Sequence, residues 1–200
     1  MALSNASKAG MVIFAGTVQF GIFLVVSEIL YSAYGTNGYS MSANYVSDLG
    51  ANCPSSGACY IPPSAMLYNS SIVLLGLSAL LGAFYLQRAF HWTPGTAMVV
   101  LTGIGAVGVG VFPETSGNVH SIFSLVVFLF AGLNAVVNAR LQRKPMFYFS
   151  VILGLATLAA LVLYVGGADL GLGAGGMERM VVYPVLLWGV GFGGHMMATD

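Results

Sequence analysis

The sequence predicts an all-α integral membrane protein, built as a polytopic bundle of six transmembrane helices. Only 6% of its 200 residues are charged, whereas an ordinary soluble domain carries about 25%. Hydrophobic residues make up 58%, and the mean hydropathy is +0.88. Six basic and six acidic residues are too few to cover a soluble surface, and their formal net charge is zero. This composition excludes a soluble enzyme, a disordered chain and a nucleic-acid-binding protein.

Six stretches with few or no charges have the length that crosses a bilayer. About 20 apolar residues in a helix span a hydrocarbon core of about 30 Å. The strands of a β-barrel would instead alternate between polar and apolar residues over about ten positions, and these stretches do not alternate. We expect residues 1–200 to form a single transmembrane domain. The predicted spans are residues 11–31, 64–86, 95–112, 119–139, 146–165 and 180–197.

The first span leads into the longest extramembrane segment. Residues 11–31 are apolar apart from Gln19, Ser27 and Glu28, and no small-residue cleavage pattern follows Glu28. We therefore expect a retained helix rather than a signal peptide. Residues 32–63 are rich in serine, asparagine, glycine and tyrosine. Because loops of this length are often functional, we expect residues 32–63 to form a loop that caps the outer face of the bundle.

Glycines recur within the third and sixth spans. Small residues let helix backbones approach closely in lipid, so we expect these positions to serve tight helix packing. Glycine-rich helix faces also permit a homodimer without requiring one. The glycines are Gly103, Gly105, Gly108, Gly110, Gly189, Gly191, Gly193 and Gly194.

The basic residues predict how the chain lies in the membrane. Lys8, Arg88 and the group Arg140, Arg143 and Lys144 fall in alternate loops, which lie on one side of a six-span bundle. Loops rich in lysine and arginine face the cytoplasm. We therefore expect a multi-pass protein of the cell membrane with both termini cytoplasmic. The remaining basic residue falls on the opposite, extracytoplasmic side.

The two cysteines, Cys53 and Cys59, lie in the loop between the first and second spans. The short interval between them can close a disulfide in an oxidising compartment, and the charge pattern places this loop outside the cytoplasm. Two free thiols, or half of a metal site, are the alternatives. A zinc site is disfavoured because the loop contains no histidine and no further cysteine.

Most of the remaining ionisable residues collect on the predicted outer side. Charges at a membrane boundary are costly unless paired or solvated, so such a group indicates a functional site. A short turn joins Glu114 to His120, and Ser124 follows His120 by one helical turn on the same face. The outer group is Asp48, Glu114, His120, Asp169, Glu178 and Arg179, with Glu28 near the same end of the first span.

A catalytic interpretation has two versions. In the first, Asp48, Glu114 and His120 hold a divalent metal such as zinc, which activates water against a lipid ester or amide. In the second, Ser124 is the nucleophile and His120 is its base. Either version makes the protein a membrane-embedded lipid hydrolase or transferase.

Other interpretations involve no chemistry. In a lipid-binding protein, Arg179 and Tyr183 would contact an anionic headgroup, and the acids would have a structural role. Glu178, beside Arg179, is a further candidate binding residue. In a purely structural or accessory subunit, Arg179 would neutralise Glu114, Asp48 or Glu178, and His120 would hydrogen-bond a loop carbonyl. A small-solute transporter is the weaker alternative, because no acidic residue lies in the middle of a predicted span.

Three blocks of residues resemble a large family of uncharacterised prokaryotic six-helix membrane proteins, whose domain has no known function. The first block is Ser47-Asp48-Leu49-Gly50 with Pro62-Pro63 and Tyr68-Asn69. The second is Phe112-Pro113-Glu114 followed by His120. The third is Glu178-Arg179 with Tyr183-Pro184 and Trp188.

The resemblance implies a six-helix fold and adds Asn69 to the candidate binding residues, but it brings no established reaction with it. More distantly, the order of the blocks is similar to the eukaryotic Frag1 and autophagy-modulator families, some of which are linked to lipid or lipid-anchor remodelling. Together these observations predict an outward-facing polar pocket that binds, and in one version modifies, the headgroup of a membrane lipid or lipid-linked molecule.

Overall fold

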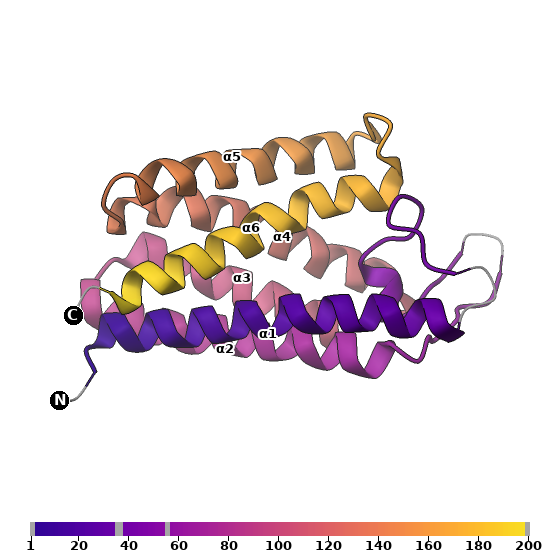
Figure 1. The fold of residues 1–200 in the computed structure, drawn as a ribbon, viewed down its shortest axis with the longest axis horizontal. Helices are drawn as coiled ribbons and strands as arrows, with labels where there is room; N and C mark the ends of the chain where they lie inside the picture. Colours follow the sequence, from indigo (N-terminus) through magenta and orange to yellow (C-terminus); the bar gives the residue numbers. More distant parts are fainter. Residues whose placement is uncertain (1–2, 35–37, 55–56, 199–200) are drawn as a thin grey trace.

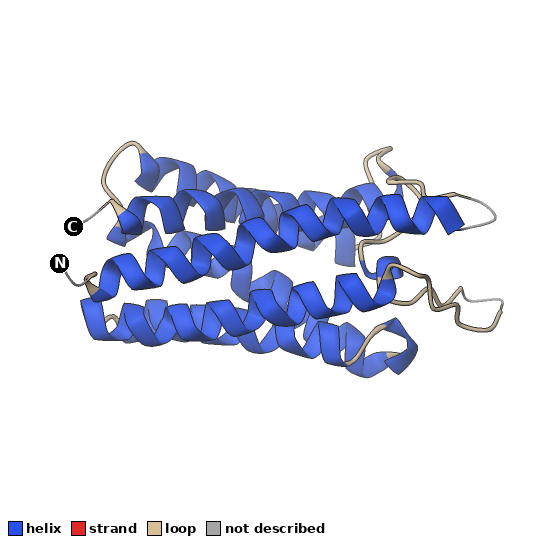
Figure 2. Ribbon diagram, turned by 60° about the horizontal axis from the view of Figure 1, so that its bottom comes forward, coloured by secondary structure: helices blue, strands red, loops and turns tan. Residues whose placement is uncertain are grey.

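The computed structural model describes residues 3–34, 38–54 and 57–198, and within these ranges it contains six long helices and no β-strand (Figure 2). Each of the six is long and apolar enough to cross a membrane, which confirms the predicted fold class. The long helices are α1 (Asn5–Tyr34), α2 (Ala65–Phe90), α3 (Thr93–Val111), α4 (Asn118–Asn138), α5 (Met146–Val165) and α6 (Gly173–Met197). Short 3-10 helices are η1 (Ser47–Leu49), η2 (Glu114–Ser116) and η3 (Ala139–Leu141).

The helices run along one long axis and form a closed ring (Figure 1). Each helix packs against the next in the chain, and α6 returns to pack against α1. Because α4 also contacts α6, α5 lies at the periphery. The interior of the bundle is therefore surrounded by α1, α2, α3, α4 and α6.

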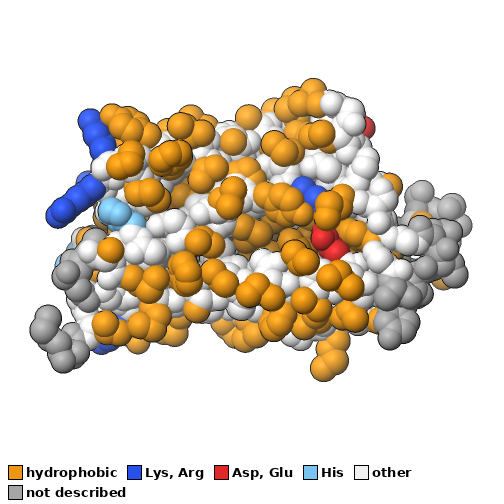
Figure 3. All heavy atoms as spheres, viewed as in Figure 1, with side chains coloured by type: hydrophobic (Ala, Val, Ile, Leu, Met, Phe, Trp, Pro, Cys, Tyr) orange, Lys and Arg blue, Asp and Glu red, His pale blue; other side chains and the backbone are white. Residues whose placement is uncertain are grey.

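The two ends of the bundle differ in charge. α1 begins and α6 ends at the same end, and the basic side chains gather there (Figure 3). We call this the basic end, defined by Lys8, Arg88, Arg140, Arg143 and Lys144. The opposite end, which carries η1, η2 and the segment 38–54, is called the polar end. Between the ends, hydrophobic side chains dominate the visible face (Figure 3).

Helix α6 begins seven residues before the predicted span, at Gly173. A side chain at Gly175 would place its Cβ 2.0 Å from the Asn44 carbonyl oxygen, and the Gly175 N–H donates to the Ser42 carbonyl at 2.9 Å. Contact with the segment 38–54, rather than local hydropathy, thus determines where α6 starts. Glu178 and Arg179 consequently lie in the second turn of α6 rather than at its start. Charged residues therefore occur within α6 as well as within α1, which contains Glu28.

Glycines allow the closest helix crossings, as predicted. A Cβ at Gly10 of α1 would lie 2.6 Å from the Gly193 carbonyl oxygen of α6, and one at Gly76 would lie 2.7 Å from the Gly103 carbonyl oxygen. Gly105, Gly108, Gly110, Gly189 and Gly191 likewise lie so close to a neighbouring helix that a Cβ would come within 3.0 Å of it. At Gly194 the packing prediction is wrong, because a Cβ there would meet nothing within 4 Å. A homodimer through glycine-rich helix faces stays a prediction.

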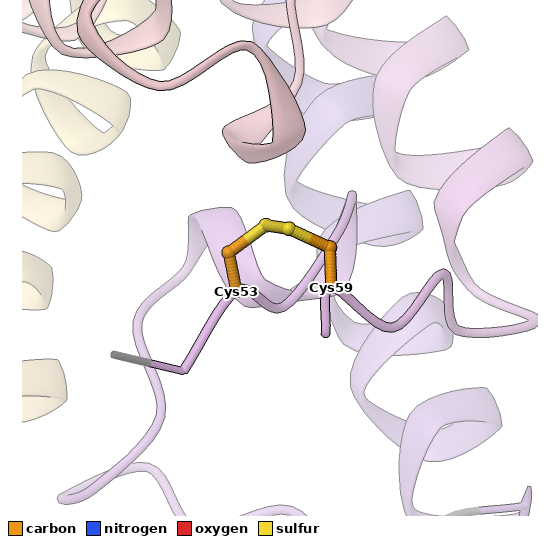
Figure 4. The surroundings of a disulfide bond; sticks show 2 residues. All are labelled: Cys53 and Cys59. Atoms are coloured by element: carbon orange, nitrogen blue, oxygen red, sulfur yellow. A yellow bond between two sulfur atoms is a disulfide. The ribbon is translucent and has the colours of Figure 1, made fainter. Parts of the chain in front are cut away.

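Cys53 and Cys59 form the predicted disulfide in the loop between η1 and α2 (Figure 4). Directly beside it, Asn52 and Tyr60 pair as an isolated antiparallel bridge, with N–H to carbonyl distances of 2.8 and 2.6 Å. The disulfide and this bridge together close a compact loop at the polar end.

Candidate functional site

The η1 turn inserts into the polar end of the bundle. Val46 and Leu49 are buried, and Ser64 donates a hydrogen bond to the Leu49 carbonyl at 2.7 Å. Asn69 of α2 donates to the Gly50 carbonyl at 3.3 Å, and its Oδ1 lies where a side chain on Gly50 would sit. The Ser-Asp-Leu-Gly block therefore places a polar turn among apolar helix ends, and Asn69 anchors that turn.

Arg179 ties this loop to two helices. Within the described chain its guanidinium donates five hydrogen bonds, and its ion pair with Glu28 of α1 has an N–O distance of 3.0 Å. Both side chains are less than 10% exposed. Its acceptors are the carbonyls of Met41, Asn44 and Gly175, the Glu28 carboxylate and the Tyr39 hydroxyl.

These contacts of Arg179 differ from two of the sequence interpretations. The structural interpretation paired Arg179 with Glu114, Asp48 or Glu178, whereas the structure pairs it with Glu28. The headgroup-binding interpretation turned Arg179 toward a ligand, but its two terminal nitrogens are committed to protein acceptors. Burial raises the pKa of Tyr39, so the hydroxyl beside Arg179 stays neutral.

A polar pocket of about 590 Å³ opens at the polar end between the outer halves of α4 and α5. The η1 segment, η2 and α6 complete its walls. Its size falls within the usual range for small-molecule sites. The polar and aromatic residues that line it are Tyr45, Ser47, Glu114, Asn118, His120, Ser121, Ser124, Phe128, Tyr164 and Glu178.

Glu114 and Asp48 form a carboxyl pair at this pocket. Asp48 is 5% exposed and accepts hydrogen bonds from the Asn44 amide at 2.9 Å and the Tyr45 backbone N–H at 3.1 Å. Burial, followed by the charge of and hydrogen bond to Asp48, raises the pKa of Glu114 to about 7. Burial likewise raises the pKa of Asp48. Two interacting carboxyls in this setting hold a proton more readily than isolated acids do.

Glu178 is a third carboxyl group without a cationic partner. It is 4% exposed, and one of its oxygens accepts a short hydrogen bond from the Val46 backbone N–H. Across the described ranges, the ion pair of Arg179 and Glu28 is the one salt bridge. Glu114 and Glu178 both line the pocket, and among the described residues neither forms a salt bridge.

His120 is 7% exposed and lies at the start of α4. Its Nδ1 lies 2.8 Å from the Phe112 carbonyl oxygen, which is the kind of loop contact that the structural interpretation predicts. Because a carbonyl can only accept, Nδ1 carries a proton, and in the neutral ring Nε2 is an acceptor. Ser124 lies one turn further along the pocket wall. Among the described residues, no hydrogen bond joins Ser124 to His120.

The candidate metal ligands do not form a cluster in this structure. Asp48 and Glu114 contact each other, and His120 lines the same pocket as Glu114. Nowhere in the described ranges, however, do three histidine, cysteine, aspartate or glutamate side chains come together as a metal site. A zinc ion at these residues stays a prediction.

An apolar cavity of about 110 Å³ lies inside the bundle next to the polar pocket. Apolar side chains such as Phe20, Ala106 and Ala131 make up most of its walls. Four residues line both spaces, so the two adjoin: Ser47, Ser124, Phe128 and Glu178.

The sequence from residue 18 to residue 195 matches a protein family whose description is "Protein of unknown function (DUF998)". The chain belongs to this family. The matched range extends from α1 into α6 and contains all three blocks of the predicted resemblance. Neither a comparison with curated proteins nor one with solved structures returned a match. Similarity to the Frag1 and autophagy-modulator families stays a prediction.

This DUF998 protein brings together only part of the predicted site. Glu114, His120, Ser124 and Glu178 line the polar pocket, and Asp48 lies behind Glu114. The other three binding candidates lie elsewhere. Asn69 anchors η1, Arg179 pairs with Glu28, and Tyr183 is 37% exposed and lines neither cavity.

Sequence reasoning named Glu28 but missed its pairing with Arg179, and it missed the aromatic residues of the pocket. The pairing could have been found because Glu28 is the one charge within the first span and a membrane charge requires a partner. Phe128 follows Ser124 by one helical turn and so shares its face. Tyr45 and Tyr164 could be assigned to the pocket only once the loop and α5 were placed beside each other; their ring centroids are 6.2 Å apart.

Proposed function

We propose that this DUF998 protein binds a membrane amphiphile, with the headgroup in the polar pocket and the hydrocarbon chain in the apolar cavity. The observation that carries the proposal is that the two spaces adjoin and share Ser124, Phe128 and Glu178 in their linings. A space that is polar at one end and apolar along the rest has the same polarity profile as a lipid.

The mouth of the polar pocket is accessible from the side of the bundle. Leu125 of α4 and Val165 of α5 line the pocket and are 49% and 68% exposed. In a membrane these apolar side chains contact lipid, close to the boundary where headgroups lie. An amphiphile can therefore enter from the bilayer without first crossing water.

The depth of the apolar cavity suits a chain from one leaflet. On α4 its lining extends from Ser124 to Asn134, which corresponds to about 15 Å of helix axis. That length is about half of a hydrocarbon core of about 30 Å. Cavities lined by apolar side chains stay dry and accept apolar ligands. At about 110 Å³ the cavity is narrow, so we expect it to hold a single chain or the end of one.

A chain-blocking substitution tests the proposal. Ala131→Leu enlarges a buried side chain in the cavity wall, while Ala159→Leu makes the same change at an exposed position on α5. We expect native mass spectrometry in mild detergent to show lipid bound to the wild type and to Ala159→Leu, with bound lipid reduced at least about tenfold in Ala131→Leu.

Thermal unfolding of each variant separates blocked binding from misfolding. If Ala131→Leu is unfolded, Ala79→Leu on α2 replaces it, because Ala79 lines the same cavity. Absence of lipid from the wild type after lipid addition, or equal occupancy in the cavity variant and the control, would contradict amphiphile binding and leave the structural interpretation. Catalysis by Asp48, Glu114, His120 or Ser124 would be an additional property of the same pocket.

A further inference from the structure

We infer that the polar pocket recognises a primary ammonium group, so that the bound amphiphile is an amine-bearing lipid. The inference rests on the proposed amphiphile binding and specifies its headgroup. It depends on three features of the pocket. These are carboxyl groups that form no salt bridge, aromatic rings beside those carboxyl groups, and buried hydrogen-bond acceptors.

The first feature is a group of carboxyl groups that no salt bridge pairs with a cationic side chain. Glu114 and Glu178 line the pocket, and Asp48 stands behind Glu114. No lysine or arginine is among the lining residues of the described chain. Arg179 is committed to Glu28 and to loop carbonyls, and the other basic residues lie at the opposite end of the bundle. Buried carboxylates are costly unless a cation pairs with them, and a bound ammonium would be such a cation.

The second feature is the aromatic lining. Tyr164 stands edge-on to both Tyr45 and Phe128, with ring centroids 6.2 and 6.3 Å apart, and all three residues line the pocket. Aromatic faces attract cations, most strongly where water is excluded. Aromatic rings beside carboxyl groups attract an ammonium group through both its charge and its N–H donors.

The third feature separates a primary ammonium from a quaternary one. His120 is 93% buried, its Nδ1 is engaged by the Phe112 carbonyl, and Nε2 is the remaining polar atom of a residue that lines the pocket. Oε2 of Glu114 is also buried and has no hydrogen-bond partner among the described atoms. An ionised Glu114 carboxylate and the Nε2 of an imidazole protonated at Nδ1 are both acceptors, so a ligand with N–H groups can donate to them. A primary ammonium has three N–H donors and a quaternary ammonium has none.

Headgroup selectivity tests the inference on the full-length protein in mild detergent. Phosphatidylethanolamine, phosphatidylcholine and phosphatidylglycerol with identical chains would be titrated and their occupancies measured by native mass spectrometry. We expect phosphatidylethanolamine to bind at least about tenfold more tightly than either of the others. Free ethanolamine, added as a competitor, distinguishes a site for a soluble amine from a site for a lipid amine.

Matched acid-to-amide variants localise the effect. Glu114→Gln removes one pocket carboxyl group. It should lower the affinity for phosphatidylethanolamine at least about tenfold and leave the affinity for phosphatidylglycerol unchanged. Asp169→Asn removes an exposed acid from the loop before α6 at the same end of the bundle and should change neither affinity. If Glu114→Gln fails to fold, Tyr164→Leu removes an aromatic wall and Tyr164→Phe serves as its control.

The outcomes distinguish this inference from the proposed function. Equal binding of the three lipids overturns ammonium recognition and leaves amphiphile binding in place. Tighter binding of phosphatidylcholine overturns the requirement for N–H donors. Binding of no lipid overturns both proposals. Saturable binding of ethanolamine without binding of any lipid shows a site for a soluble amine and overturns the assignment of an amine-bearing lipid.

Discussion

Arg179 illustrates, at the scale of single residues, how a charge is accommodated inside a membrane helix. Its guanidinium satisfies three backbone carbonyls of the loop and of α6 as well as the carboxylate of Glu28. The planar guanidinium presents several donors in a fixed geometry, which a lysine ammonium does not. The residue therefore links α1, α6 and the segment 38–54 at one point.

We expect Arg179→Met to destabilise the protein by about 3–5 kcal/mol, because it leaves the Glu28 carboxylate buried without a partner. The stability of Arg179→Lys should lie between that of the wild type and that of Arg179→Met. The double variant Glu28→Gln/Arg179→Met should lose less than the sum of the single changes, since neither charge is then stranded. Tryptophan fluorescence during thermal unfolding in detergent measures each stability.

Arg143→Met is the control for this comparison. Arg143 is exposed at the basic end, and exposed substitutions usually change stability by less than about 0.5 kcal/mol. Equal melting temperatures for Arg143→Met and Arg179→Met would show that the ion pair contributes nothing to stability.

At the scale of the helices, glycine positions determine how closely neighbouring helices approach. Gly10 and Gly193 let the backbones of α1 and α6 touch where the ring closes. Gly21 lies on the same helix α1, but no atom from another element lies within 4 Å of where its Cβ would be. Two glycines of one helix thus have different roles, and composition alone does not separate them.

We expect Gly10→Ala to destabilise the bundle by about 1–3 kcal/mol, because the added Cβ would overlap backbone atoms of α6 at 2.6–2.7 Å. Gly21→Ala should be neutral or stabilising by up to about 1 kcal/mol, because alanine favours the helix and meets no obstacle. Thermal unfolding of the two variants under one detergent condition tests the difference. A larger loss for Gly21→Ala would contradict the packing of α1 against α6.

At the scale of the whole molecule, the ring of helices separates the charges into two ends. Basic residues gather at the end where α1 begins (Figures 1 and 3). The polar pocket and the disulfide lie at the other end. By the preference of lysine and arginine for the cytoplasm, we propose that the polar end faces out of the cell membrane. The disulfide agrees with this orientation, because disulfides persist in oxidising compartments.

Single-cysteine labelling tests the orientation. Asp169→Cys places a thiol at the polar end and His91→Cys places one at the basic end, both at exposed positions. With a membrane-impermeant maleimide, we expect Asp169→Cys to be labelled in intact cells and His91→Cys only after permeabilisation. The wild type, whose two cysteines are joined, is the unlabelled control. The reverse labelling pattern would invert the proposed topology.

The sequence by itself determined the six spans, the separation of the basic end from the polar end, and the cysteine pair. These are properties of neighbouring residues: hydropathy averaged over about 20 positions and the order of charged loops require no knowledge of how helices pack. The proximity of Glu114 and His120 in one pocket wall was also accessible, because a short turn joins them.

Only the tertiary structure decided that Arg179 pairs with Glu28, 151 positions away, that α6 begins at Gly173, and that the polar pocket adjoins an apolar cavity. Each of these depends on how helices rotate about their axes and which faces meet. In helices that are apolar nearly all round, hydropathy does not mark the inward face. Packing at the glycine crossings sets those rotations, and with them the residues that line the site.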